Sequence, residues 1–177
     1  MLITIWKMDR KKKEILTLSI GIALLPPLWA VLAPYIGIKT GAVALICAGL
    51  YVTNGNKQKD GLKIMFGFWC GDLWAVLAIL IMEHINFNQN LELFLTLSIL
   101  GFFAVIIASL FEKILFLPSW LCGWAIGLTI MTGENIINLQ DICIQIAVAM
   151  AVGVWYVGAG VDLFTIYILS KDRKKGN

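Results

Sequence analysis

The sequence predicts an all-α membrane protein with six transmembrane helices in one domain covering residues 1–177. Hydrophobic residues make up 60% of the chain and charged residues 14%, and the mean hydropathy is +0.87, whereas soluble domains are near half apolar and a quarter charged. The apolar runs are long and lack the alternation of a membrane barrel. At about 20 residues per crossing, this length allows about six spans. The lipid bilayer is therefore the expected surrounding.

Each predicted helix is a distinct apolar run. The runs cover residues 14–37, 40–53, 62–83, 91–111, 115–131 and 142–169. The first follows five basic residues and ends near Pro34, and the third carries Asp72 near its middle. The fourth follows a polar loop at 84–90, and the sixth contains Asp162 about seven residues before its end.

The second and fifth segments are too short for regular straight crossings. At 1.5 Å per residue they give about 21 and about 25 Å of helix, against a hydrocarbon core of about 30 Å. Proline precedes or begins both, at Pro34 and Pro118, and it removes a backbone donor that a helix needs. Irregular backbone at membrane depth is tolerated where protein buries it or where it lines a watery cavity, so these segments indicate a pathway.

The basic residues predict that both termini are cytoplasmic, because loops rich in Lys and Arg stay inside. Six spans place 13 of the 14 Lys and Arg residues on one side, and only Lys39 on the other. The expected location is the inner, or plasma, membrane, with a multi-pass chain.

The two halves of the chain show a faint internal repeat. Residues 48–55 align with residues 126–133 and share glycines, and Asp60 falls opposite Asp141 with a small gap. Repeats of about 14–83 and 91–169 hold three spans each. Because three is odd, the second copy enters the membrane from the opposite side, which gives a 3+3 inverted repeat.

Two intramembrane carboxylates are the leading candidates for a functional site. Asp72 has to face the bundle or a cavity, since a charge at the bilayer centre costs about 2.5 to 3.5 kcal/mol on insertion scales. It serves either as a polar contact in a pathway or as a hydrogen-bonded clamp between helices. Asp162, nearer the cytoplasmic end, is a second candidate.

The short segments supply the other pathway candidates, which are Thr40, Gly49, Pro118, Trp120, Gly123, Trp124 and Gly127. Glycine lets a backbone carbonyl approach a permeant, although helix packing is the competing interpretation. The two tryptophans, four residues apart, either wall a constriction or fill packing gaps.

Other classes of function are not indicated. The chain has no GxSxG, HExxH or glycine-rich nucleotide motif and a single histidine, so we expect neither an enzyme nor a cofactor. Its four cysteines form no CxxC pair and are expected to be buried thiols, with no metal. The sequence has no basic stretch with interleaved aromatic residues, so it does not indicate nucleic-acid binding.

The stretch Phe116-Leu117-Pro118-Ser119-Trp120-Leu121-Cys122-Gly123, together with the size and span pattern, resembles the YcdZ-like family of small bacterial inner-membrane proteins of unknown function. The likeness covers most of residues 15–165, but Trp120 stands where a smaller residue is expected. The family implies no established substrate.

The hypothesis that follows is a channel or facilitator for a small polar or neutral solute, such as urea, an amide, a short acid or water. Its path would run between the two repeats, with one pore in each protomer of a homo-oligomer. A proton- or ion-coupled transporter and a non-transporting subunit that docks a partner are the alternatives.

Overall fold

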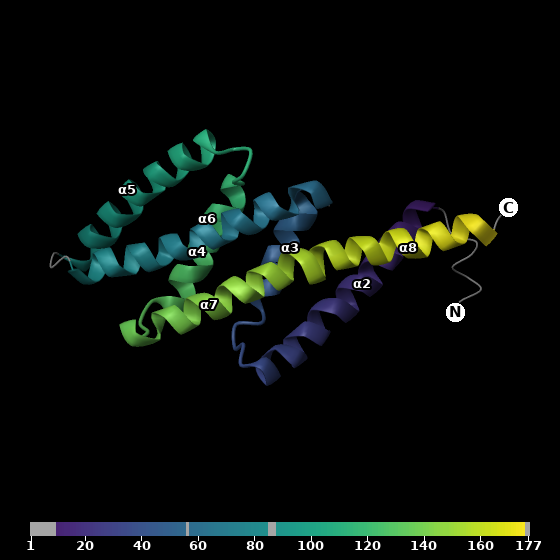
Figure 1. Ribbon diagram of the computed structural model, residues 1–177, viewed down its shortest axis with the longest axis horizontal. Helices are drawn as coiled ribbons and strands as arrows, with labels where there is room; N and C mark the ends of the chain where they lie inside the picture. Colours follow the sequence, from purple (N-terminus) through teal and green to yellow (C-terminus); the bar gives the residue numbers. More distant parts are fainter. Residues whose placement is uncertain (1–9, 56, 85–87, 176–177) are drawn as a thin grey trace.

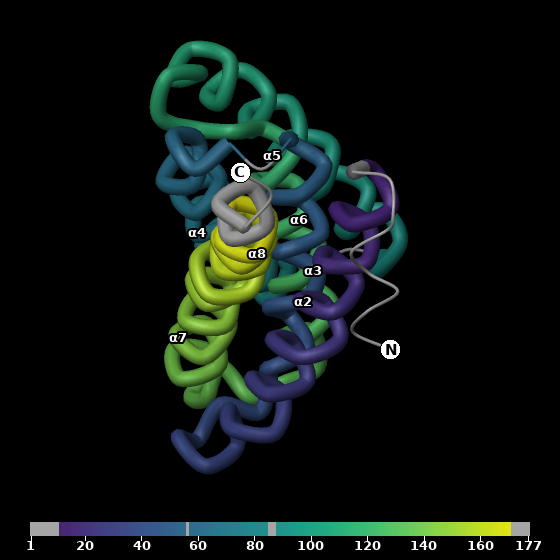
Figure 2. The backbone as a smooth tube through the Cα atoms, turned by 90° about the vertical axis from the view of Figure 1, so that its right-hand side faces the viewer, coloured from purple at the N-terminus to yellow at the C-terminus, as the bar shows by residue number. Residues whose placement is uncertain are grey.

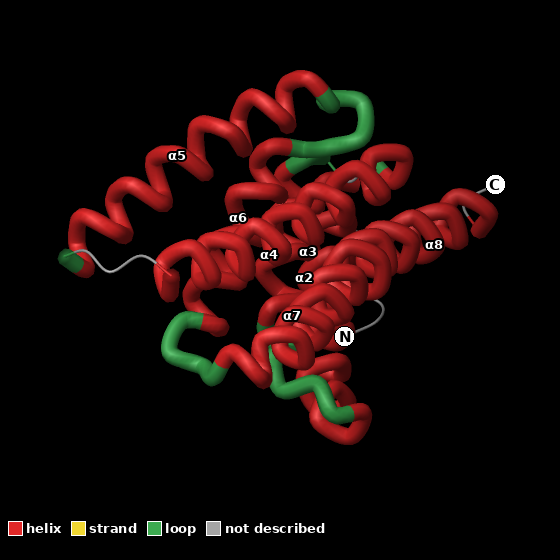
Figure 3. Tube along the Cα trace, turned by 60° about the vertical axis from the view of Figure 1, so that its left-hand side comes forward, coloured by secondary structure: helices red, strands yellow, loops and turns green. Residues whose placement is uncertain are grey.

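The computed structural model describes residues 10–55, 57–84 and 88–175, and all the elements in these ranges are helical (Figure 3). They are α2 (Arg10–Leu32), η1 (Ala33–Ile36), α3 (Val43–Thr53), η2 (Gln58–Asp60), α4 (Gly61–His84), α5 (Gln89–Leu110), α6 (Leu117–Met131), α7 (Ile136–Val152), η3 (Gly153–Ala159) and α8 (Gly160–Lys175). Each of the six predicted apolar segments is a helix, which confirms the all-α class.

Four helical stretches are long and apolar enough to cross a membrane, namely Lys11–Ile36, Gln58–His84, Gln89–Leu110 and Ile136–Ser170. The two shorter apolar helices are α3 and α6, as predicted. Two residues after its last helical residue, each is followed by a glycine with positive φ, 79° at Gly55 and 89° at Gly133, where a side chain would strain the backbone. The two turns differ, because Asn54 is close to helical (φ −76°, ψ 6°) whereas Thr132 is extended (φ −64°, ψ 125°).

Proline acts differently at the two short helices. Pro34 lies in η1, after which the chain leaves the helix through Gly37, whose φ is 81°. Pro118 is in the first turn of α6, where a missing N–H costs nothing. The expectation that Pro118 disturbs the fifth helix is therefore wrong, because it starts a regular one.

The sixth segment is irregular, which its sequence does not indicate. The helix from Ile136 to Lys175 is continuous along the molecule (Figure 1), but Gly153–Ala159 within it is π-helical. Such π segments are rare in helices and are frequent at functional sites.

The helices of the two halves interlock. The short helix α6 packs on α4, and the short helix α3 packs on η3 and α7. On the outside, α5 lies against α4, and α2 lies alongside α8 (Figures 1 and 2). The third segment of each half therefore contacts the second segment of the other half.

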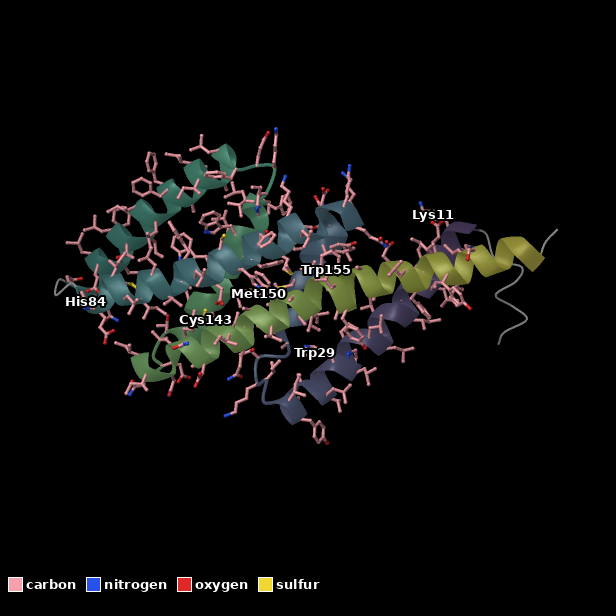
Figure 4. All side chains as sticks on the ribbon, viewed as in Figure 1. Lys11, Trp29, His84, Cys143, Met150 and Trp155 are labelled. Carbon is pink, nitrogen blue, oxygen red and sulfur yellow. The ribbon has the colours of Figure 1, made fainter. Side chains whose placement is uncertain are left out.

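The core forms where α3, α4, α6 and the centre of the last helix meet. Tyr51, Phe68 and Met150 are among its fully shielded side chains. By contrast, α5 buries only a stripe at every fourth residue, consisting of Thr96, Leu100, Ala104 and Ala108, and most of its other large apolar side chains project outward (Figure 4). An outer surface this apolar is typical of contact with lipid.

Candidate functional site

Asp72 is the only carboxylate found buried in the part of the chain that the structure describes. It occupies the middle of α4 and is 1% exposed. The Cys143 thiol of α7 donates a hydrogen bond to Asp72 Oδ2 at 3.1 Å. Among the described residues, Oδ1 has no hydrogen-bond partner. A thiol is a weak donor, so the protein leaves much of this carboxyl group's bonding capacity unused.

The α4–α6 crossing brings Asp72 beside Gly127, and Gly123 packs on α4 about one turn earlier, at Phe68. A Cβ on Gly127 would lie 3.1 Å from Asp72 Oδ1 and 2.5 Å from Ala75 Cβ. A Cβ on Gly123 would collide with the Phe68 carbonyl, and one on Gly71 would collide with the Trp120 carbonyl. The backbones of α4 and α6 are thus in direct contact, and at Gly123 the space is filled by protein.

An open groove of about 440 Å³ lies between α4 and α7 and borders Cys143, the hydrogen-bond partner of Asp72. It is lined by Leu73, Val76, Leu80, Ile136, Leu139, Gln140, Cys143 and Ile144. Cys143 belongs both to this lining and to the hydrogen bond with Asp72. In Figure 4, Cys143 lies toward the end where His84 is labelled, far from Lys11. Most of the residues that line the groove are apolar. The Cys143 thiol connects the groove to the Asp72 carboxyl group through its hydrogen bond.

Trp120 and Trp124 lie next to the two glycines of α6, each three residues before one of them, and their rings reach toward α5. Trp120 packs with Ala104 and Ala108 of α5 and stacks edge-on against Trp74, with ring centroids 5.3 Å apart. Both tryptophans are buried, and their indole N–H groups have no acceptor among the described residues. The two indole rings pack toward α5, whereas the neighbours of the Asp72 carboxyl group are Gly127 of α6 and Cys143 of α7.

The remaining predicted residues lie apart from Asp72. Gly49 is exposed on α3 and a Cβ there would meet nothing within 4 Å, so it does not make the close approach that Gly127 makes. Pro118 is exposed at the start of α6. Thr40 precedes α3, with its hydroxyl buried and unpartnered in the described region, and Asp162 is half-buried in the first turn of α8.

A second crossing, between α3 and η3, was not predicted as a site. A Cβ on Gly153 would collide with the Ala44 carbonyl, and one on Gly158 would lie 2.8 Å from the Tyr51 ring. Tyr51 is 0% exposed, and its hydroxyl has no partner within the described ranges. The sequence signal for this crossing is the pair Gly153 and Gly158. They are five residues apart, a spacing that does not place both on one face of a regular α-helix.

The described residues contain no group of three or more His, Cys, Asp or Glu side chains placed to hold a metal ion. A family model described as "Protein of unknown function (DUF1097)" matches residues 19–166. No curated protein and no solved structure matches the chain. The expectation of an uncharacterised family is thus confirmed.

Proposed function

Because the chain belongs to the DUF1097 family of proteins of unknown function, its activity has to be inferred from its own site, and we propose that it is a membrane channel or facilitator for a small polar or neutral solute. Candidate solutes are urea, an amide, a short acid or water. The observation that carries the proposal is Asp72, fully shielded at the middle of a spanning helix and with an oxygen that no described group satisfies.

A buried carboxyl group in a bilayer needs partners, because no water is available there to satisfy it. A helix clamp would use both oxygens on protein donors, but Asp72 uses one, on a weak donor. Unsatisfied buried polar atoms call for an explanation, and an unseen water or solute is a common one. The free oxygen of Asp72 is therefore assigned the role of a polar contact for the permeant.

The proposed path begins in the groove between α4 and α7 and passes Cys143 to Asp72. It does not run through the α4–α6 contact at Gly123, where backbone meets backbone. Gly127 lies beside the free Asp72 oxygen but is packed against Ala75 and Met131. The proposal therefore requires a second, open arrangement in which α4 and α6 move apart near Asp72.

The inverted 3+3 repeat is supported by the helix contacts. In the repeat, α2, α3 and α4 correspond to α5, α6 and the last helix, which consists of α7, η3 and α8. The contact of α4 with α6 therefore corresponds to the contact of η3 with α3, and the contact of α4 with α5 corresponds to the contact of α8 with α2. The turn glycine Gly55 corresponds to Gly133 in the same way. A pseudo-twofold axis in the membrane plane accounts for this pattern.

The proposed orientation is N-in and C-in in the inner membrane. In Figure 1 the start of α2 and the end of α8 lie toward one end of the molecule, the end of α4 and the start of α7 lie toward the other, and the start of α4 lies between them. The first of these ends carries most of the Lys and Arg residues, which positions it in the cytoplasm. The groove then opens toward the outer side. The exposed apolar surfaces of α5 and α2 are available for contacts within a homo-oligomer.

Flux into proteoliposomes tests the proposal. Vesicles that contain the purified protein are exposed to urea, acetamide, acetate and osmotic gradients, with protein-free vesicles as the reference. We expect at least one solute to enter faster with protein present, and Asp72→Asn, which keeps the shape, to change that rate several-fold. Glu134→Gln, an exposed residue in an outer loop, is the matched control. Equal rates for all solutes with and without protein refute the channel.

A non-transporting subunit that docks a partner is the second candidate, and the close-packed α4–α6 contact is the observation that favours it. In that case Asp72 holds helices together, and Asp72→Asn changes the unfolding temperature but no flux. A coupled transporter would instead show uptake that responds to a pH gradient.

A further inference from the structure

The first long helix, α2, contains two consecutive prolines near its middle, Pro26 and Pro27. Proline has no backbone N–H, so each leaves the carbonyl four residues earlier without its helical partner. These are the carbonyls of Ile22 and Ala23, and no side chain within the described ranges donates to either of them. At membrane depth no water replaces the missing donor, and hydroxyl side chains of neighbouring helices are one of the groups that supply it.

The unmatched acceptor at Ala23 is on the exposed side of α2. Pro26 is buried, whereas Ala23 and Pro27 are both exposed. The hydroxyl side chains of α2 itself donate to carbonyls one turn earlier in the same helix. The helix therefore has an acceptor on its outer surface and no donor of its own for it.

The other outer helix, α5, has the opposite feature. Ser98 is exposed, and its hydroxyl has no hydrogen-bond partner in the part of the chain that the structure describes. The exposed Ser109 of the same helix differs, because its hydroxyl donates to the Val105 carbonyl at 2.7 Å. Ser98 is thus a free donor on the outer surface of α5.

The donor and the acceptor lie at the same depth in a bilayer. The candidate spans are Lys11–Ile36 and Gln89–Leu110, and Ala23 and Ser98 are each within about 2 Å of the middle of their own span. Figure 1 shows α2 and α5 on opposite sides of the molecule. The donor of one copy can therefore reach the acceptor only in another copy.

The surfaces around the two groups also fit in shape. On α5, the serine lies between Phe94 and Phe102, one turn away on either side, and their side chains are 65% and 62% exposed. On α2, the exposed residues one turn away from Ala23 are compact, namely Ser19 and Pro27. Two projecting rings thus have a low surface on which to lie.

We propose that α5 of one copy packs against α2 of the next copy, with the Ser98 hydroxyl donating to the Ala23 carbonyl. The contact joins two different surfaces, so its repetition builds a closed ring in which all copies have the same orientation. Pairing of α5 with α5 would leave the Ala23 carbonyl unmatched, and pairing of α2 with α2 would bring two acceptors together. The inference specifies the homo-oligomer of the proposed function and rests on the membrane placement given there, but not on solute flux.

Oxidative cross-linking of the full-length chain in isolated membranes tests the contact. The double variant Ala23→Cys with Ser98→Cys should form covalent dimers and larger species several-fold more than either single variant, with the four native cysteines present throughout. Leu24→Cys with Ser98→Cys is the matched control, because Leu24 is also exposed but lies about 100° around the helix axis. A single variant that cross-links as well as the double variant indicates a symmetric contact and overturns the proposal.

A second set of variants tests the hydrogen bond. Pro27→Ala restores the N–H that the Ala23 carbonyl lacks, so it should weaken association in detergent about threefold or more, and Ser98→Ala should do the same. The two changes together should weaken association no more than either alone, because they remove the same bond. Ser109→Ala, whose hydroxyl already bonds within its own helix, should have no effect. Light scattering on a dilution series measures the equilibrium.

A chain that stays monomeric at every concentration, with lipid covering both faces, refutes the proposal. So does association that neither Pro27→Ala nor Ser98→Ala changes, and so does a control pair at Leu24 that cross-links as strongly as the pair at Ala23. Flux at Asp72 is measured separately. A ring without flux loses only the channel, and a monomer that transports solute loses only this contact.

Discussion

At the scale of single residues, the contact between α4 and α6 depends on the absence of side chains. Gly67, Gly71 and Gly123 each have a neighbouring atom where a Cβ would lie, and for Gly71 and Gly123 that atom belongs to the opposite backbone. Small residues allow such close approach between membrane helices, where packing replaces the hydrophobic effect as the main attraction. The α4–α6 contact is therefore intolerant of even one added methyl group.

Gly71→Ala should destabilise the folded protein by about 3 kcal/mol or more, because overpacking against rigid backbone cannot be relieved by a side-chain rotation. Gly49→Ala is the matched control, since a Cβ there meets nothing within 4 Å. It should leave stability unchanged or raise it by up to about 1 kcal/mol, the usual cost of helical glycine. Unfolding in detergent, followed by circular dichroism, compares the two. Equal stability of both variants would contradict the close contact.

The same glycines show what the sequence could and could not reveal about the candidate site. Asp72 was identifiable because a carboxylate within a long apolar run has to be buried. Gly49 was expected to match Gly127 because the two align in the repeat, yet Gly49 is exposed. An alignment compares residue types. The direction in which a side chain points depends instead on how each short helix is rotated about its axis relative to the helix it packs against. The packing of Tyr51 on Gly158 was missed for the same reason.

At the scale of helices, the π-helical segment controls how the last helix meets α3. A Cβ on Gly158 would meet only the Tyr51 side chain, at 2.8 to 3.1 Å, whereas Gly153 faces the Ala44 backbone. These two glycines therefore differ in how a substitution can be accommodated.

Gly158→Ala should destabilise by about 1 to 3 kcal/mol in the natural background, and by less when Tyr51 is also replaced by alanine, because most of the opposing ring is then gone. Gly153→Ala should show no such relief with Tyr51→Ala. A double-mutant cycle on unfolding free energies measures both coupling terms. A cycle with zero coupling between positions 158 and 51 would contradict the packing of the ring on η3.

Helix positions were predictable because apolar run length alone defines them, and the short lengths of α3 and α6 were visible in the same way. The π-helical segment was not predictable. Residues 142–169 are apolar except at a few positions such as Gln145 and Asp162, so their hydropathy does not register one extra residue in a turn. Only the fit of Gly153 and Gly158 against α3 reveals it.

At the scale of the whole molecule, the third segment of each half packs on a helix that belongs to the other half. The packing surface of α4 is supplied by α6, and that of η3 by α3. Neither half can therefore bury its small-residue faces alone.

We expect two fragments, residues 1–86 and 87–177, to be degraded when each is expressed separately and to accumulate as a complex when they are expressed together. Co-purification through a tag on one fragment measures the association. Introducing Gly71→Ala into the first fragment should abolish it, while Gly49→Ala should not. Stable accumulation of either fragment alone would argue against interlocked halves.

The interlocking also constrains biosynthesis. With 11 residues, α3 is about 16 Å long, so it is too short to be held securely in a bilayer by its own hydrophobicity. The segment it packs against, η3, comes later in the chain, after α4, α5, α6 and α7. More than 90 residues, counting from Thr53 to Gly153, separate the end of α3 from this packing partner. We therefore expect α3 to need shelter by insertion machinery or a chaperone until η3 is made, and a truncation that removes η3 to be as damaging as a lesion in α3 itself.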